Sequence, residues 1–156
     1  KNEYPDVGWS GEVIHHSQFL NYLIEEGKLK VPADTFNGSR VVFHDPCYLG
    51  RANGEYEAPR KVIDSMKTER VEMQRNKSFA LCCGAGGAQM FKEAEPGSKE
   101  IYAERTEEAL GTGASVIVTA CPFCMTMLTD GIKYQNREED VKNLDIAEMI
   151  ANALGL

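Results

Sequence analysis

The chain has 156 residues, 42 % of them hydrophobic, and a formal net charge of −7 at pH 7. This length and apolar content suit one domain with a hydrophobic core. No apolar run reaches the roughly 18 residues of a membrane span, and an acidic chain lacks the basic face that nucleic acid requires. The first eight residues are polar and turn-forming, so no signal peptide is expected. Because the chain starts without Met, we expect it to be part of a longer protein.

Helical and β-type patterns alternate along the chain. Apolar residues at helical spacing predict helices, and short β-branched or aromatic runs predict strands. In chain order, the predicted elements are a strand over 12–15, a helix from an N-cap at Ser17 to about 26, a strand over 41–43, a helix over 59–66, strands over 71–73 and 79–81, a helix over 99–110, a strand over 115–119, and helices over 122–132 and 145–154. This alternation predicts an α/β layered, Rossmann-like domain with a small, mostly parallel sheet flanked by helices.

The same pattern predicts the domain organisation. Residues 1–11 are rich in turn-forming residues and are predicted to be a linker. Residues 12–156 are predicted to form a single cysteine-rich domain, since neither an internal repeat nor a low-complexity stretch interrupts them.

Every cysteine of the chain belongs to one array, which consists of Cys47, Cys82, Cys83, Cys121 and Cys124. Each group follows a predicted strand, and the carboxyl ends of parallel strands share the edge of the sheet at which ligands bind. We therefore expect the thiols to meet. An odd number of cysteines suits a disulfide framework poorly, and a domain of this size does not need one. A reducing compartment and a metal or redox site are expected.

Soft thiolates bind zinc, copper(I) or iron–sulfur clusters. A structural zinc site usually takes two Cys-x-x-Cys pairs, and this chain has only one. Adjacent cysteines in extended backbone point to opposite faces, which favours a larger, multi-iron group. A cubane takes four thiolates, so a fifth would bind elsewhere or serve substrate chemistry. A zinc-binding interaction domain and thiol–disulfide exchange through Cys121 and Cys124 stay open as alternatives.

Residues beside the cysteines are candidates for supporting roles. Gly84, Gly86 and Gly87 predict a loop whose backbone can approach a bulky inorganic group and direct N–H groups at sulfur. Pro122 suits the first turn of a helix, whose dipole would favour thiolates at its start. His44 is expected either to tune the site or to be a structural residue. Asp45 is expected to cap the turn that contains Cys47.

These motifs resemble the cysteine-rich CCG domain. The residues that carry the resemblance are His44-Asp-Pro-Cys47, Cys82-Cys83-Gly84 and Cys121-Pro-Phe-Cys124, and it extends over about residues 12–150. That family includes catalytic subunits of heterodisulfide reductase. It also includes iron–sulfur subunits of lactate, glycerol-3-phosphate and electron-transfer-flavoprotein-linked oxidoreductases.

The resemblance implies a function and a ligand set. It implies that all five cysteines ligate a [4Fe-4S] cluster of non-cubane type, although some modules of the family bind zinc. It also implies that the chain is the C-terminal, electron-transferring module of a longer oxidoreductase. Its partners would be other iron–sulfur or flavin domains of the same protein or complex. The acceptor would be a disulfide or a quinone-linked chain, and the location cytoplasmic, free or at the cytoplasmic face of a membrane complex.

Overall fold

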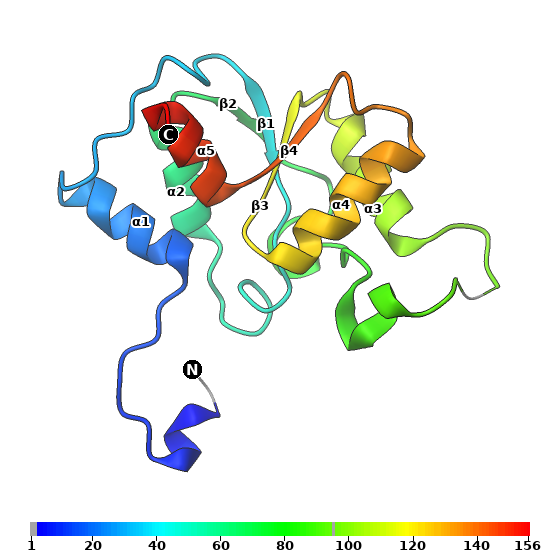
Figure 1. The fold of residues 1–156 in the computed structure, drawn as a ribbon, viewed down its shortest axis with the longest axis horizontal. Coiled ribbons are helices and arrows are strands. Elements are labelled where there is room, and N and C mark those ends of the chain that lie inside the picture. The colour runs from blue at the N-terminus through cyan, green and yellow to red at the C-terminus, as the bar shows by residue number, and fades with distance from the viewer. Residues whose placement is uncertain (1–2, 95) are drawn as a thin grey trace.

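Four parallel strands form one sheet in the order β2-β1-β3-β4, with helices on both faces (Figure 1). The structure is a computed structural model that describes residues 3–94 and 96–156. The strands are β1 (Arg40–Phe43), β2 (Glu69–Val71), β3 (Val116–Thr119) and β4 (Lys142–Asp145). The helices are α1 (His16–Glu25), α2 (Glu57–Ser65), α3 (Ile101–Gly111), α4 (Pro122–Tyr134) and α5 (Ile146–Leu154), with short 3-10 turns at Tyr4–Val7, Lys77–Phe79 and Gly86–Phe91. The predicted α/β layered fold is confirmed.

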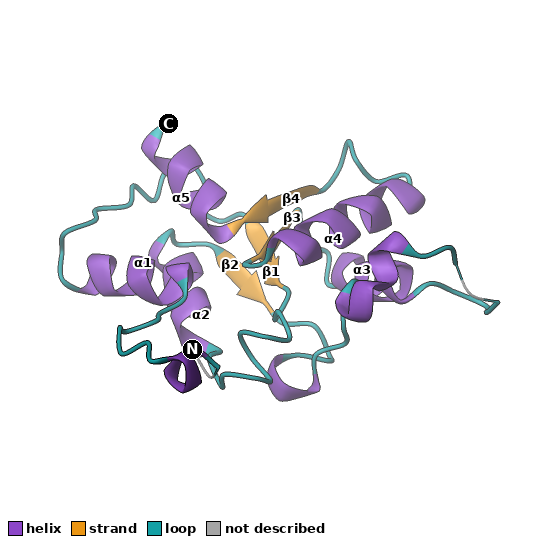
Figure 2. Ribbon diagram, turned by 60° about the horizontal axis from the view of Figure 1, so that its bottom comes forward, coloured by secondary structure: helices purple, strands orange, loops and turns teal. Residues whose placement is uncertain are grey.

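Alternation along the central strands builds two apolar layers. Val41 and Phe43 face α2 and α5, whereas Val42 and Ile117 face α3 and α4. Figure 2 shows the sheet between α1, α2 and α5 on one side and α3 and α4 on the other. These four side chains are fully buried, and full burial of each one contributes about 1.5–3 kcal/mol. The central strands are therefore the most strongly fixed part of the fold.

The predicted strand over residues 12–15 is wrong. Those residues belong to no helix or strand, and Val13 and Ile14 are 41 % and 46 % exposed, so the run is not buried against the sheet. His15, and not Ser17, is the N-cap of α1: its Nδ1 accepts the backbone N–H of Ser17 at 3.2 Å. Its Nε2 lies 3.1 Å from the Ala120 carbonyl oxygen, which ties the start of α1 to the end of β3.

The strand predicted over residues 79–81 is also wrong. A 3-10 turn ends at Phe79, whose side chain is 84 % exposed, and residues 80–83 belong to no helix or strand. Both edges of β1 are already paired, with β2 and β3, and residues 79–81 lie outside this four-stranded sheet. The strand predicted at 71–73 lies two residues earlier, as β2, and β4 was not predicted.

The order of the strands creates a switch point. From β1 the chain moves to β2 on one side, and then returns to β3 and β4 on the other. Ligands of open α/β sheets bind outside the carboxyl ends of the strands at such a point. Here it lies between the ends of β1 and β3.

Among the described residues, every helix is too short or too polar to cross a bilayer. Of the predicted linker, residues 1 and 2 lie outside the described residues, and its role stays a prediction.

Candidate metal centre

Cysteines from three parts of the chain lie around the switch point. Cys47 follows β1, Cys121 follows β3, and Cys124 lies in the first turn of α4. The Sγ atoms of Cys83 and Cys124 are 3.4 Å apart, although 41 residues separate them. Both side chains are buried, with 4 % and 2 % exposed. The predicted meeting of the thiols at the carboxyl edge is therefore observed for this pair, even though Cys83 follows a loop and not a strand.

The buried pair forms the centre of a larger cluster. Two further cysteines and four other side chains pack with it, and the members of this thiol cluster are Cys82, Cys83, Cys121, Cys124, Ala85, Met90, Met127 and Tyr102. Cys47 is half-buried and lies close enough to contribute to the raised pKa of Cys82. The structure thus gathers four of the five thiols in one apolar cluster and places the fifth beside it.

Backbone N–H groups point at the sulfurs. The N–H of Gly84 donates to Sγ of Cys82 at 3.3 Å. Gly84 has a φ of +91°, which L side chains rarely adopt, and an added Cβ would lie 3.4 Å from the backbone nitrogen of Tyr102. A glycine is therefore required where this donor is formed. Gly86 and Gly87 lie in the exposed 3-10 turn that follows, and their predicted cofactor role stays a prediction.

The pKa values of the clustered thiols are shifted in alternating directions. Hydrogen bonds from Cys124 and Cys82 lower the pKa of Cys83, whereas hydrogen bonds with Cys121 and Cys83 raise the pKa of Cys124. A hydrogen bond with Cys83 and burial raise the pKa of Cys82. A hydrogen bond from Cys124, aided by the first N–H groups of α4, lowers the pKa of Cys121 to about 6. Without metal, the thiols therefore share protons between sulfur atoms.

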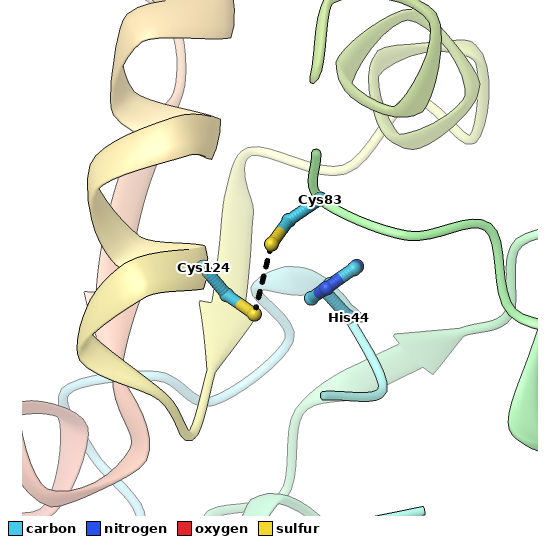
Figure 3. Close-up of side chains that lie close together, drawn as sticks. All are labelled: His44, Cys83 and Cys124. Atoms are coloured by element: carbon cyan, nitrogen blue, oxygen red, sulfur yellow. Dashed lines mark hydrogen bonds between the residues drawn. The ribbon is translucent and has the colours of Figure 1, made fainter. Parts of the chain in front are cut away.

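His44 is the third potential ligand at the centre. One of its ring nitrogens and the Sγ atoms of Cys83 and Cys124 all lie within 4.8 Å of one another (Figure 3). His44 is 1 % exposed, and burial lowers its pKa, so the imidazole is neutral. The Nε–H of Arg105 donates to its Nδ1 at 3.0 Å. The sequence pointed to His44 but not to Arg105, and the only signal was an arginine on the apolar side of the predicted helix over 99–110.

Asp45 makes a buried ion pair and does not cap the turn of Cys47, so that expectation is wrong. Arg60 from α2 donates to both carboxylate oxygens of Asp45, at 2.7 and 2.9 Å, and also reaches Glu72 at 2.8 Å. Asp45 accepts the backbone N–H of Lys77 at 2.8 Å as well. The side chains of Asp45 and Arg60 are each 2 % exposed. The ion pair fixes the segment between β1 and Cys47 to α2, and the hydrogen bond from Lys77 fixes it to the segment that leads to Cys82.

The family profile described as CCG, cysteine-rich domain, matches residues 41–129. The chain belongs to this family. The matched segment begins inside β1 and ends inside α4, so it contains all five cysteines and both sides of the switch point. The predicted family membership is confirmed.

Several curated proteins are similar to nearly the whole chain. A probable iron-sulfur-binding oxidoreductase, FadF, of Bacillus subtilis is 44 % identical over 99 % of the chain and 22 % of its own length. An EtfAB:quinone oxidoreductase of Syntrophomonas wolfei is 41 % identical, with the same coverage. A dihydromethanophenazine:CoB–CoM heterodisulfide reductase component of Methanosarcina barkeri is 41 % identical over 93 % of the chain and 34 % of its own length. The chain spans about a fifth to a third of these relatives.

Proposed function

We propose that this chain is the iron–sulfur cluster-binding, electron-transfer module of an oxidoreductase of heterodisulfide reductase type. The proposed ligands are Cys47, Cys82, Cys83, Cys121 and Cys124. The observation that carries the proposal is the packing of four of these thiols, from two distant segments, into one apolar cluster at the switch point of the sheet. A [4Fe-4S] cluster bound there would supply one-electron storage and transfer.

The chemistry of the site fits such a cluster. Thiolates are the ligands of iron–sulfur centres, and metal binding releases the protons that the thiols otherwise share. The alternating pKa shifts describe such sharing within the cluster. A single tetrahedral zinc ion would use only four of the five thiols. The names of the similar proteins from Bacillus and Methanosarcina, an iron-sulfur-binding oxidoreductase and a heterodisulfide reductase component, also favour iron and sulfide.

The protein itself would ligate the cluster and set its potential. Hydrogen bonds to cluster sulfurs and low solvent exposure are the means by which proteins tune such centres. Gly84 already donates to the sulfur of Cys82, and Cys83 and Cys124 are nearly inaccessible to solvent. We propose that electrons arrive from another iron–sulfur or flavin domain of the same protein or complex. The acceptor would be a disulfide or a quinone-linked partner, at the cytoplasmic side.

The test is metal analysis of the chain after anaerobic purification and reconstitution with iron and sulfide. We expect about four iron and four sulfide per chain, with a paramagnetic signal that changes on reduction. The matched variants are Cys83→Ser and Ala85→Ser. Both place a serine in the thiol cluster, but only the first removes a thiol. We expect Cys83→Ser to lose the cluster and Ala85→Ser to keep it.

Two outcomes would contradict the proposal. Stoichiometric zinc, with no uptake of iron after reconstitution, would leave a zinc-stabilised interaction domain. Disulfide reduction by the metal-free chain that requires Cys121 and Cys124 but not Cys47 would instead show a thiol–disulfide exchanger.

A further inference from the structure

A histidine beside two thiols invites the interpretation that it is a metal ligand. The nitrogen of His44 and the sulfurs of Cys83 and Cys124 have the mutual spacing of ligands to one ion. The choice between ligand and hydrogen-bond donor depends on which ring nitrogen carries the proton. A neutral imidazole has one N–H and one lone pair, and only the nitrogen with the lone pair can bind metal.

Arg105 decides the tautomer. Its guanidinium has donors and no acceptor, and it stays protonated in proteins. Since its Nε–H donates to Nδ1 of His44 at 3.0 Å, Nδ1 must supply the lone pair. The single proton of the neutral ring is then on Nε2, and Nε2 has no lone pair to offer. Both residues are buried, with 1 % of His44 and none of Arg105 exposed, so water does not replace this contact.

We propose that His44 donates its Nε2–H to the sulfur of Cys83 and is not a metal ligand, and that Arg105 is the positioning residue that fixes this role. Its consequence rests on the proposed function: with a cluster bound, this hydrogen bond would stabilise the more negative, reduced state of the centre. It is supported by the position of the ring, because a nitrogen of His44 and the sulfur of Cys83 lie within 4.8 Å of each other in the buried centre.

The charge of Arg105 strengthens the effect. The guanidinium pairs with one carboxylate, Glu108, at 3.0 Å, and with the carbonyl oxygen of Arg75 at 2.8 Å. Among the described residues, Nη2 of Arg105 has no hydrogen-bond partner. A buried cation behind the imidazole polarises the ring and makes Nε2–H a stronger donor, because the interior screens charge weakly.

The first test uses the metal-free chain labelled with ¹⁵N-histidine. Long-range ¹H–¹⁵N spectra distinguish the two tautomers, and His44→Gln identifies the resonances of His44 among the three histidines. We expect the Nε2–H tautomer in the wild type. Arg105→Leu should allow exchange with the Nδ1–H form, whereas Arg75→Leu, which removes a neighbouring arginine that does not touch His44, should not. A wild-type ring with its proton on Nδ1, or with two protons, would overturn the inference.

The second test uses the reconstituted chain. We expect His44→Leu to keep its iron but to shift the reduction potential downward, and His44→Gln, whose amide can still donate, to restore it. Loss of iron from His44→Leu, or a direct ¹⁵N–metal coupling in the wild type, would show that His44 is a ligand. If the chain takes up no iron, the proposed function fails, whereas the tautomer measured in the metal-free chain still decides the role of His44.

Discussion

Two buried arginines flank the end of β1, and they meet consecutive residues. Arg105 from α3 binds His44, and Arg60 from α2 binds Asp45. Neighbouring side chains in extended backbone point to opposite faces, and α2 and α3 cover opposite faces of the sheet (Figure 2). Arg60 makes five hydrogen bonds, four of them to two carboxylates. Arg105 makes three, one of them to a carboxylate.

The two arginines differ in how fully carboxylates compensate their charge. Two carboxylates more than neutralise Arg60, and although burial alone would lower its pKa, Asp45 and Glu72 raise it. Burial lowers the pKa of Arg105, because Glu108 compensates only in part. The Arg60 side of β1 therefore fixes the backbone, whereas the Arg105 side keeps a less fully compensated positive charge against the imidazole of His44.

The largest loss of stability is expected when Arg60 is replaced. Arg60→Leu leaves Asp45 buried without its partner, and removing one member of a buried ion pair costs about 3–5 kcal/mol. Urea unfolding of the metal-free chain measures the loss. The control is Arg70→Leu, which removes an arginine from the more exposed pairs with Asp64 and Glu72. An equal cost for both variants would mean that burial does not distinguish the two arginines.

In the metal-free chain, Arg105→Leu should lower the free energy of unfolding by less than Arg60→Leu does. Arg105→Leu removes hydrogen bonds to Glu108 and to a carbonyl oxygen, and we expect a loss of about 2–3 kcal/mol. The loss is smaller because Glu108 keeps the N–H groups of Arg75 as partners. The same unfolding experiment measures it. A cost as large as that of Arg60→Leu would remove the distinction between the two sides.

Acid should reduce the stability that the contacts of Arg105 contribute, because it protonates their carboxylate partner, Glu108. Burial alone would raise the pKa of this carboxyl, but the N–H of Arg75 and the charge of Arg105 hold it below 4.5. Because the folded-state pKa is the lower one, the stabilisation is complete above about pH 4.5 and is lost as the pH falls through the folded-state pKa. We expect Glu108→Gln to cost about 1–2 kcal/mol at pH 7 and progressively less below pH 4.5. A cost that does not change with pH would contradict this assignment.

The smallest loss of stability is expected when Arg75 is replaced. Its side chain is 39 % exposed and pairs with Glu104 and Glu108. Exposed ion pairs contribute about 0–1 kcal/mol, so Arg75→Gln should change the free energy of unfolding by less than about 1 kcal/mol. A larger loss, measured by urea unfolding, would show that Glu108 depends on Arg75 more than on Arg105.

Apolar periodicity predicted the layers but not every strand. The runs around Val42 and Ile117 were recognised because both faces of a central parallel strand are apolar. β4, with the sequence Lys-Asn-Leu-Asp, was missed because an edge strand needs few β-branched residues. The run over 79–81 resembled a strand only in its residue types, and it follows a 3-10 turn outside the sheet.

Of the site, the cysteines were predicted from the sequence, whereas the buried contacts that hold the neighbouring residues were not. Thiols after three predicted strands were expected to meet at the carboxyl edge, although the strand predicted before Cys82 is wrong, and the spacing of the cysteines pointed to one centre. Neither buried arginine was assigned a role. Asp45 and Arg60 lie 15 residues apart and His44 and Arg105 lie 61 apart, so no local pattern records these contacts. They depend on how α2 and α3 pack on the sheet.

The segment that carries Cys82 and Cys83 has a consequence for how metal would arrive. Residues 80–94 contain one 3-10 turn and take no part in the strand ladder. They are held by side-chain packing and a few hydrogen bonds, so this segment can detach while the sheet stays folded. Such local opening would expose the otherwise inaccessible sulfurs of Cys83 and Cys124. Amide hydrogen exchange over 80–94 should therefore be fast without metal and slow with it, so that loading the centre completes the folding of this domain.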